Sequence, residues 1–362
     1  MFVNLHWKKN DMTATVTEGK ISQFESMLGS ASRAAVVTHT RPDGDAVGSA
    51  AAMTAWLLAH GLDARLLLPN ACPANILFVM DGVCDGKVLQ RDIEPKAVKE
   101  WIAGCDLVVC LDISGFDRAE GMQEDLQASK ARKVLIDHHL GPKEEDFDLV
   151  FSETEISSTC ELLFWILLGT EDAGGDASKL PMPILRALLA GMTTDTNNFA
   201  NSVFPSTFEM ASLMLAAGVD RDSVINEIYN RGRENRLRMM GHLLKDNMRI
   251  LPCGAAYIVA RASELAGYGI REGEMEGLVN MPLTMDKVRL SIFLKEDIGL
   301  FRVSVRSKRG TSAYRLAKRY FHGGGHEQAS GGKLFFPEDI ADASLAGSYI
   351  EKVVNEYFES ED

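Results

Sequence analysis

The sequence predicts an α/β protein: an N-terminal domain with a parallel sheet and a smaller α/β C-terminal domain, joined by a helical linker. With 362 residues the chain is too long for one small core, so two domains are expected. In the first half, short runs that are hydrophobic throughout alternate with helical patterns, which indicates a parallel sheet covered on both faces. The hydrophobic period changes after about residue 250, where a second set of strands begins.

The strands and helices of the first half follow from their apolar runs. Residues 34–38 (AAVVT) form a β-branched run, and the loop HTRPDGD leads from it into a helix that ends at Gly61. Further apolar runs end in acidic or polar residues and predict strands at 64–70, 105–112 and 133–139. Longer periodic segments predict helices of the same domain at 157–169 and 182–195.

A charged helical stretch separates the two halves. Residues 206–250 are helical in pattern, and their charged middle suits an exposed connecting helix. The second half then reads as four strands: AAYIVA, VRLSIFLKE, LFRVSVRSK and GGKLFF. We place an N-terminal tail at 1–19, with Met12 as an alternative start, the first domain at 20–220, the linker at 221–250 and the second domain at 251–362.

Composition and cysteine content narrow the class of protein. A formal net charge of −13 weighs against tight binding to long duplex nucleic acid, although metal ions can mask carboxylates locally. The six cysteines form no CxxC pair and are expected to be reduced thiols of a cytoplasmic protein. The longest apolar stretch, residues 162–169, is too short to span a bilayer, so no membrane partner is expected. The sequence leaves a homodimer open.

Acidic residues and histidines gather where the predicted strands end. In an open parallel sheet, ligands bind in the crevice beyond the carboxyl ends of the strands, so residues that are far apart in sequence meet there. The residues at these ends, and at the end of the helix 182–195, are His39, Asp43, Asp45, Asp112, Asp137, His138, His139 and Asp195.

This set of side chains suits two divalent metal ions. Aspartates together with imidazoles supply hard oxygen and borderline nitrogen ligands, which favours Mn²⁺ over an all-oxygen Mg²⁺ site. Asp43 and Asp45 can turn toward different metals, and Asp112 could bridge the pair with its two oxygens. Metals roughly 3.5–4 Å apart hold a hydroxide and clamp both oxygens of a phosphoryl displacement. The helix that begins at about Ala46 would add its positive end beside a substrate phosphate.

Each motif alone has a plainer explanation. Pro42, Asp43 and Gly44 also make a good turn, and Asp45 is a good N-cap for the following helix. A surface turn could hold the adjacent histidines, which point to opposite faces as long as the strand continues. The metal prediction therefore depends on all four segments meeting at one edge of the sheet.

A basic segment in the second half predicts a phosphate-binding surface. From Ile298 to His326 there is no acidic residue, whereas seven lysines and arginines are present. On a strand, Arg302, Ser304 and Arg306 share one face, which presents two guanidinium groups and a hydroxyl to phosphate. The cations with helical spacing are favoured as a solvated helix face: Arg315, Lys318 and Arg319.

The motif HGGGH (322–326) predicts a second element of this surface. The N–H groups of Gly323, Gly324 and Gly325 could form an anion-binding nest, and His326 could stack on a base or bind a terminal phosphate. His322 is the weaker candidate, and a flexible turn before the next strand is the plainer alternative. With metals on one wall of a cleft and this surface on the other, very short nucleotides would be favoured over long strands.

The order of these motifs resembles the DHH phosphoesterases, a family with a two-manganese centre. The four N-terminal motifs are HTRPDGDAVGS, CLDISGFDR, LIDHHL and GMTTDTNNF. The C-terminal half is similar to the DHH-associated domain through RVSVRSK and FHGGGHEQASGG. The resemblance covers nearly the whole chain from about residue 20. Length and layout look most like the bacterial oligoribonucleases (nanoRNases) that are also phosphatases of 3′,5′-bisphosphate nucleotides (pAp).

The resemblance implies a role for each residue. One metal would be held by His39, Asp43 and Asp112, and the other by Asp45, Asp112, His138 and Asp195. His139 would face the scissile phosphate, and Asp137 would orient an imidazole. Asn197 departs from the glycine that often follows the last DT pair in this family, but asparagine tolerates a left-handed backbone.

The resemblance also implies a Mn²⁺-dependent phosphohydrolase, with Mg²⁺ or Co²⁺ as alternative metals. It would degrade short single-stranded oligoribonucleotides and pAp-type nucleotides by metal-activated hydroxide attack. Cyclic dinucleotides, their linear products, pyrophosphate and polyphosphate stay open as substrates. A processive single-strand DNA exonuclease is less favoured, because the chain is acidic and lacks length for an added nucleic-acid-binding module. A non-catalytic nucleotide-binding protein would be expected to lack a metal ligand, and every expected ligand is present.

Overall fold

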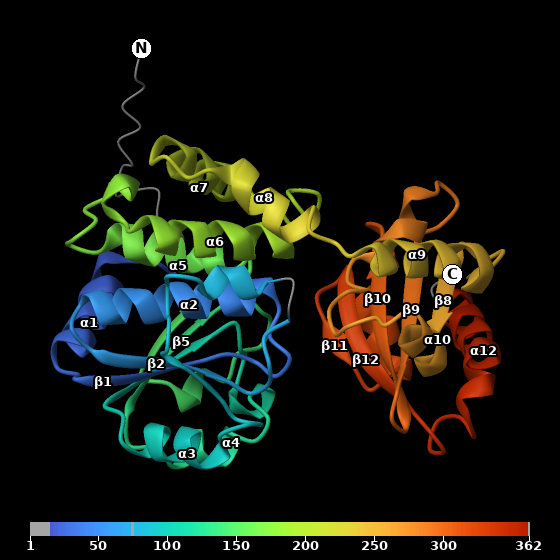
Figure 1. The fold of residues 1–362 in the computed structure, drawn as a ribbon, viewed down its shortest axis with the longest axis horizontal. Coiled ribbons are helices and arrows are strands. Elements are labelled where there is room, and N and C mark those ends of the chain that lie inside the picture. Colours follow the sequence, from blue (N-terminus) through green and yellow to red (C-terminus); the bar gives the residue numbers. More distant parts are fainter. Residues whose placement is uncertain (1–14, 74–75, 361–362) are drawn as a thin grey trace. The chain divides into compact units, whose positions relative to one another are not determined.

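The computed structural model describes residues 15–73 and 76–360 (Figure 1). The chain forms two compact units, Met1–Arg231 and Gly232–Asp362, each with its own six-stranded sheet. Residues 1–14, and with them the alternative start at Met12, lie outside the described residues. No helix in the described parts of the chain has the length and hydrophobicity that a membrane crossing requires.

The sheet of the first unit is parallel throughout, with the strand order β3-β2-β1-β4-β5-β6. Its strands are β1 (Arg33–Val37), β2 (Asp63–Leu68), β3 (Val88–Gln90), β4 (Leu107–Leu111), β5 (Arg132–Asp137) and β6 (Leu149–Ser152). The predicted parallel sheet is confirmed. The sequence does not predict the edge strands β3 and β6, because three or four residues show too little periodicity to distinguish a strand from a loop.

Helices cover both faces of this sheet (Figure 1). One face is covered by α1 (Glu18–Gly29), α2 (Gly44–Ala59), α5 (Thr159–Gly169) and α6 (Met182–Asp195), and the other by α3 (Pro95–Ala103) and α4 (Gln123–Ala128). In β1, Ala34 and Val36 belong to the core on the first face, whereas Ala35 and Val37 belong to the core on the second. A strand buried on both faces has no polar side, which explains its continuous hydrophobic sequence.

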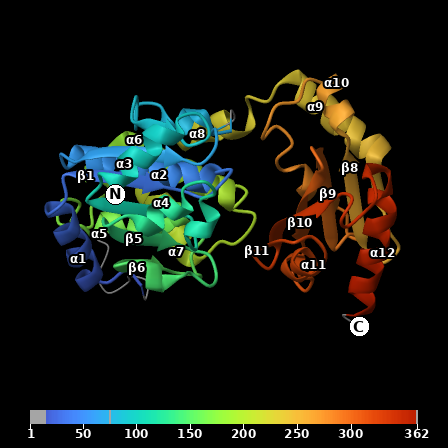
Figure 2. The same cartoon turned by 90° about the horizontal axis from the view of Figure 1, so that it is seen from below.

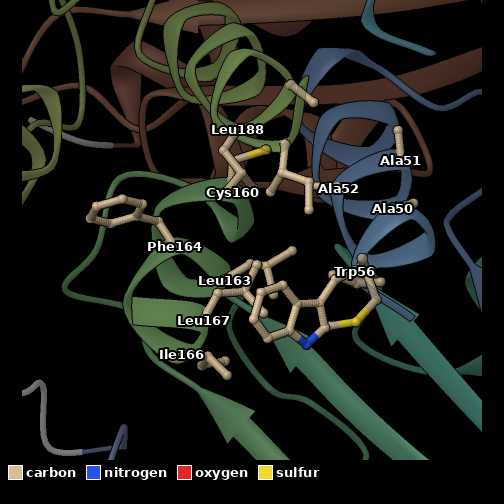
Figure 3. Close-up of a cluster of buried hydrophobic side chains, with 14 of the residues drawn as sticks. Ala50, Ala51, Ala52, Trp56, Cys160, Leu163, Phe164, Ile166, Leu167 and Leu188 are labelled. Atoms are coloured by element: carbon tan, nitrogen blue, oxygen red, sulfur yellow. The ribbon is translucent and has the colours of Figure 1, made fainter. Parts of the chain in front are cut away.

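The larger core lies where α2, α5 and α6 meet, with Trp56, Leu163 and Leu188 among its side chains (Figure 3). The backbones approach closely there. A Cβ atom on Gly191 would lie 2.3 Å from Sγ of Cys160, and one on Gly48 would lie 2.7 Å from the carbonyl oxygen of Ala187. Glycine therefore lets α2 and α6 cross in near contact, which fixes the start of α2 beside the end of α6.

Residues 15–19 already pack against the first unit, so the predicted tail at 1–19 is too long. Val16 is fully buried, and the Thr15 hydroxyl accepts a hydrogen bond from the N–H of Ser152. Thr17 caps α1, which begins at Glu18. These residues read as a tail because two or three buried side chains show no periodicity.

The predicted linker at 221–250 is not one helix. It contains α8 (Arg221–Tyr229), α9 (Glu234–His242), the π-helical turn η6 (Leu243–Asn247) and β7 (Met248–Ile250). Val224 of α8 is buried in the core of the first unit, together with residues of α7 (Pro205–Ala216). Met239 and Leu243 are buried in the second unit instead. The charged stretch is thus split, because each half buries its few apolar side chains in a different core.

The second unit has a mixed sheet with the strand order β11-β12-β10-β9-β8-β7. Besides β7, its strands are β8 (Ala255–Ala260), β9 (Leu290–Asp297), β10 (Leu300–Ser307), β11 (Gly324–Gly325) and β12 (Ala329–Phe335). Its other helices are α10 (Ala262–Gly267), α11 (Ala313–Tyr320) and α12 (Ala346–Glu359). Short 3₁₀ turns complete the two units: η2 (Leu77–Met80), η3 (Phe116–Arg118), η4 (Glu144–Asp146), η5 (Ala177–Lys179), η7 (Leu278–Thr284) and η8 (Ala343–Leu345).

The two faces of the second sheet differ in how far they are covered. α11 and α12 cover one face, where Phe301, Val303 and Val305 of β10 are buried (Figure 2). On the other face, α9, α10 and η7 cover β8 and β9, as the burial of Ile258 and Phe293 shows. The β10–β12 half of that face is left half-exposed. The predicted alternation of buried and exposed residues in β10 is confirmed.

Candidate metal centre and phosphate-binding face

The structure brings together the six residues that the sequence predicts as metal ligands. His39, Asp112 and His138 follow the carboxyl ends of β1, β4 and β5, which are neighbours in the sheet. All three side chains are buried. The remaining ligands come from the two helices that cross above the sheet: Asp43 and Asp45 at the start of α2, and Asp195 at the end of α6.

His39, Asp43 and Asp112 form the first group of ligand atoms. Nε2 of His39 lies 3.9 Å from Oδ1 of Asp43 and 3.3 Å from Oδ2 of Asp112. Nδ1 of His39 lies 3.0 Å from the carbonyl oxygen of Thr40, and donation to that oxygen leaves Nε2 as the ligand atom. One ligand atom from each residue lies within 4.8 Å of the other two, so a single ion could contact all three.

Asp45, Asp112 and His138 form the second group, and Asp195 lies beside it. Nε2 of His138 lies 3.8 Å from Oδ2 of Asp45 and 3.7 Å from Oδ1 of Asp112. The same nitrogen lies 3.6 Å from Oδ2 of Asp195. One imidazole nitrogen thus faces three carboxylates, which is a nitrogen and oxygen set suited to a divalent ion.

Asp112 is shared by both groups. Its Oδ2 faces His39, whereas its Oδ1 faces His138. Its backbone has a φ of 58°, in the left-handed region that aspartate tolerates better than most residues. This conformation turns the chain sharply at the end of β4, which places the carboxylate between the two groups.

The first turn of α5 holds two of the carboxylates, which the sequence did not reveal. The N–H groups of Thr159 and Cys160 donate to the two oxygens of Asp45 over 2.7 and 2.8 Å. The Thr159 hydroxyl donates to Oδ1 of Asp112 over 3.1 Å. Ser158 is the N-cap of this helix, and the S-x-x-E spacing that begins at Ser158 is the sequence signal that marks the helix start.

The start of α2 differs from the prediction. The helix begins at Gly44 rather than Ala46, and Asp43 rather than Asp45 is its N-cap. Oδ1 of Asp43 accepts hydrogen bonds from the N–H groups of Asp45 and Ala46, both over 3.1 Å. Asp45 cannot serve as the cap because α5 takes up its carboxylate. Since Asp43 uses these two N–H groups, this helix end does not offer them to a substrate phosphate.

The two adjacent histidines lie side by side rather than on opposite faces. β5 ends at Asp137, so the alternation of a strand no longer applies to His138 and His139. Their ring centroids are 4.8 Å apart, with the rings nearly perpendicular. Nδ1 of His139 lies 2.8 Å from Oδ1 of the buried Asp137. Burial lowers the pKa of His139, but the hydrogen bond to Asp137 and the negative charges of Asp112 and Asp137 together outweigh it and raise this pKa to about 9.

The buried charges shift the protonation of the ligand residues in a way that divalent cations would relieve. Burial, reinforced by the carboxylates of Asp112 and Asp195, raises the pKa of Asp45 well above its usual range. Burial lowers the pKa of His39, but hydrogen bonds to Asp112 and Asp43 outweigh it and raise that pKa. Metal ions would neutralise the carboxylates and replace the proton on His39. The residues therefore fit two divalent metal ions.

Asn197 occupies the position where glycine is common in the resembling family. Its φ is 47°, so the left-handed backbone that the resemblance implies is present. Asn198 and Phe199 continue in the same region, with φ of 57° and 67°. The Phe199 ring stacks on Phe208 of α7 with centroids 5.4 Å apart, which holds this unusual turn directly after Asp195.

The predicted phosphate-binding residues of β10 lie on the half-exposed face of the second sheet. Arg302 is paired with Asp297, whose Oδ2 lies 2.6 Å from its Nη2. Arg306 donates from Nη1 to the carbonyl oxygens of Val305 and Ser330. Both guanidinium groups are thus oriented by neighbours of the same unit. Among the cations of α11, Arg319 donates a hydrogen bond to Ser360, and Lys318 donates one to the Tyr314 hydroxyl.

The glycine loop forms a tight hairpin between β11 and β12. The N–H of Gly323 donates to the carbonyl oxygen of Ala317, and that of His326 donates to Ala329. A Cβ atom on Gly323 would lie 1.9 Å from the carbonyl oxygen of Gly331. Glycine is therefore required because β11 and β12 approach closely, and the N–H of Gly323 is not free for an anion, contrary to the prediction from the sequence. His322, the weaker candidate, bonds Asp339 over 2.9 Å, which is a structural contact within the unit.

The sequence matches two protein-family domains, one in each unit of the fold. Residues 33–192 match the DHH family, N-terminal domain, and residues 254–347 match the DHHA1 domain. The chain belongs to the DHH family. The resemblance inferred from the motifs is confirmed, and the DHH match contains every predicted metal ligand except Asp195, which follows it by three residues.

Several proteins similar in sequence to this DHH protein are named as phosphoesterases. It is 27% identical over 311 residues to the bifunctional oligoribonuclease and PAP phosphatase NrnA of Bacillus subtilis, covering 85% of this chain and 91% of the relative. It is also 27% identical over 201 residues to the cyclic-di-AMP phosphodiesterase GdpP of that organism, covering 54% of this chain and 30% of the relative. A crystal structure of an exopolyphosphatase-related protein from Bacteroides fragilis superposes with a TM-score of 0.87 and 30% identity, covering 97% of this chain and 99% of that one.

Proposed function

We propose that this DHH protein is a Mn²⁺-dependent phosphohydrolase that degrades short oligoribonucleotides and pAp-type 3′,5′-bisphosphate nucleotides. The observation that carries the proposal is the position of Asp112, whose carboxylate is shared by two groups of ligand atoms. Two metal ions held close together act as a clamp on both oxygens of a phosphoryl displacement. The relationship to NrnA over most of both chains supports the substrate class.

The metal ligands divide into two sets around Asp112. His39, Asp43 and Asp112 would hold one ion, and the other would be held by Asp45, Asp112, His138 and Asp195. Imidazole beside carboxylate favours Mn²⁺, with Mg²⁺ and Co²⁺ as alternatives. Two such ions supply an activated water and offset the charge of the reacting phosphate. Thr159 and the N–H groups of α5 would keep two of the carboxylates oriented.

His139 would contact the reacting phosphate, with Asp137 as its positioning residue. Because Nδ1 of His139 is bonded to Asp137, Nε2 is the atom that would donate a hydrogen bond to a phosphate oxygen. The hydrogen bond to Asp137 favours the protonated ring, and it raises the pKa of His139 in the metal-free protein. A positive donor at this place would stabilise the negative charge that develops in the transition state.

The open half of the second sheet would bind nucleotide phosphates. Ser304 of β10 lies in register with Gly331 of β12, which in turn pairs with Gly324 of β11. The surface between the two arginines of β10 therefore carries little besides a serine hydroxyl. A ribose or base could lie on such a floor, while guanidinium groups reach phosphates on either side. The proposed substrate contacts are Arg302, Ser304, Arg306, Gly323, Gly324, Gly325 and His326.

A substrate panel tests the proposal. Purified protein with Mn²⁺ would be given pAp, a 5′-phosphorylated dinucleotide, a cyclic dinucleotide, a long single-stranded RNA and pyrophosphate. We expect pAp and the linear dinucleotide to turn over at least about tenfold faster than the long RNA and pyrophosphate. Equal rates on the dinucleotide and the long RNA would contradict the proposed preference for short substrates.

A second test separates the metal centre from the fold. Asp112→Ala removes the shared carboxylate, so turnover should fall by about a thousandfold or more, because both ions lose a ligand. Asp92→Asn is the matched control, since Asp92 is an exposed acid of the same unit. Near wild-type activity of Asp112→Ala would show that the carboxylate does not bridge two ions.

Cleavage of cyclic dinucleotides is the second candidate function, because the chain is related to GdpP over about half its length. A higher rate on the cyclic dinucleotide than on pAp in the same panel would favour it. We also propose a cytoplasmic location, since no disulfide forms among the described residues and five of the six cysteines are buried.

A further inference from the structure

Glu272 lies over cations of the proposed phosphate-binding face. It belongs to the loop between α10 and η7, and its side chain is 67% exposed. Its Oε2 lies 2.5 Å from Nζ of Lys295, and its Oε1 lies 3.6 Å from Nη1 of Arg302. An acidic side chain that faces solvent thus contacts two cations on the face where a substrate phosphate is expected.

These cations belong to a row that crosses three strands. Arg302 of β10 is directly opposite Lys295 of β9 and Lys333 of β12. Neighbouring strands are about 4.8 Å apart, so like charges at opposed positions repel each other. Glu272 and Asp297 offset the charges of Lys295 and Arg302, whereas Lys333 makes no ion pair within the described part of the chain. The row therefore keeps an excess of positive charge.

Glu272 is not needed to build the loop that carries it. Glu274 stabilises the loop instead, since it pairs with Arg233 and accepts a hydrogen bond from the N–H of Arg271. Glu272 contacts only the two cations among the described residues. The Glu272 carboxylate faces solvent, where an ion pair is weakened by water, so a ligand can displace it at small cost.

We propose that Glu272 is a built-in competitor for the substrate phosphate on the Lys295–Arg302–Lys333 row. Its carboxylate covers the row until a nucleotide phosphate displaces it. A competitor that carries one negative charge lowers the affinity of the row for every anion. Only ligands with a high negative charge therefore keep a useful affinity for the row.

This competition favours a class of substrate within the proposed function, on which it rests. A terminal phosphate monoester carries a charge of about −1.5 to −2 at neutral pH, whereas an internal diester carries about −1. The monoester gains more from the row and displaces Glu272 more readily. Short nucleotides that end in a phosphate should therefore bind the second unit better than the interior of a long strand.

Binding to the full-length protein without metal tests the proposal independently of hydrolysis. The probe is a 5′-phosphorylated diadenylate, titrated calorimetrically into the EDTA-treated wild type and into Glu272→Gln. We expect the variant to bind about three- to tenfold more tightly. The slope of its log affinity against log salt concentration should become steeper by about the equivalent of one further phosphate contact. In an Arg302→Gln background, the same change should improve binding less than twofold.

Glu234→Gln is the matched control, because Glu234 is an exposed acid of the same unit that pairs with Arg238 in its own helix. It removes the same charge and should leave binding within twofold of wild type. Unchanged or weaker binding by Glu272→Gln would overturn the proposal, and so would an equal gain in Glu234→Gln. Since no metal is present, these outcomes do not depend on whether the protein hydrolyses the probe.

Discussion

Asp112 and Thr159 show how single residues assemble the candidate metal centre. Asp112 leaves β4 with a left-handed backbone and directs one oxygen to each group of ligands. Thr159 donates to that same carboxylate through its hydroxyl and to Asp45 through its N–H. A carboxylate held by such partners is oriented before any metal binds, which reduces the freedom lost on binding.

Removal of the Thr159 hydroxyl should weaken metal binding without disturbing the helix. Thr159→Val keeps the backbone N–H that Asp45 needs but loses the hydrogen bond to Asp112. Loss of such an outer partner typically costs about 10- to 100-fold in metal affinity, and we expect about tenfold here. Titration of Mn²⁺ into metal-free protein measures it. Thr159→Ser is the rescue control, and equal affinities of the valine variant and wild type would exclude this role.

The Asp137–His139 pair should make the metal-free protein lose stability as the pH rises. The pKa of His139 is raised to about 9, above its ordinary value near 6.5. A raised pKa stabilises the folded state fully below about pH 6.5, and this contribution is lost as the pH rises through about 9. We expect a contribution on the order of 3 kcal/mol, since one pKa unit corresponds to about 1.4 kcal/mol.

Urea unfolding of wild type and Asp137→Asn at pH 6 and pH 9.5 measures this contribution. The variant should be less stable at pH 6, and the difference between the two proteins should shrink at pH 9.5. A constant difference across this range would show that Asp137 does not hold a proton on His139.

At the scale of elements, the site depends on the crossing of α2, α5 and α6. Gly44 lies under Thr194, where a Cβ atom would be 2.2 Å from the threonine Oγ1. Gly191 lies against Cys160 and the carbonyl oxygen of Gly44. Close approach at both glycines brings the ligands at the start of α2 to the ligand at the end of α6.

Gly191→Ala should destabilise this crossing. Its new Cβ atom would meet Sγ of Cys160 at 2.3 Å and the carbonyl oxygen of Gly44 at 2.9 Å, so the helices must move apart. Overpacking of this kind costs about 1–3 kcal/mol in the free energy of unfolding, which urea unfolding measures. Gly29→Ala in α1 is the control, because no atom lies within 4 Å of its added Cβ. Equal stabilities of the two variants would contradict the close crossing.

At the scale of the whole molecule, charge is distributed unevenly: the first unit holds a cluster of buried carboxylates, and the second unit has a row of cations on its sheet. The protein has a net charge of −13, and part of its acidic charge is concentrated in the buried carboxylates of the first unit. Their mutual repulsion opposes folding unless protons or cations compensate it. Metal binding and stability should therefore be coupled in the first unit.

Added Mn²⁺ should raise the unfolding temperature of metal-free protein. At a free concentration of about 100 times the Kd, binding to the folded state adds about 2.7 kcal/mol, or roughly 5–10 °C for a unit of this size. Differential scanning calorimetry with and without Mn²⁺ measures the shift. Asp112→Ala should show little of it, and an equal shift in that variant would mean that the ion binds elsewhere.

Much of the fold and the ligand set was accessible from the sequence because each depends on local patterns. Hydrophobic strands that alternate with helices predict a parallel sheet, and the carboxyl ends of such strands meet at one edge, which groups His39, Asp112 and His138. Other features depend on partners distant in sequence. The α5 turn that binds Asp45, the cap at Asp43 and the split of the predicted linker all follow from which core each segment joins.

The sequence by itself determined the parallel architecture, the four aspartates and two imidazoles of the centre, and the shared face of Arg302, Ser304 and Arg306. The architecture and the shared face follow from periods of two and 3.6, which are properties of the chain alone, whereas the choice of these six ligands follows from the resemblance of the motifs to the DHH family. Only the tertiary structure decided that one carboxylate is shared, that α5 orients it, that the glycine loop is a closed hairpin, and that Glu272 covers two cations. Contacts between distant segments depend on packing, and no period in the sequence records which surfaces meet.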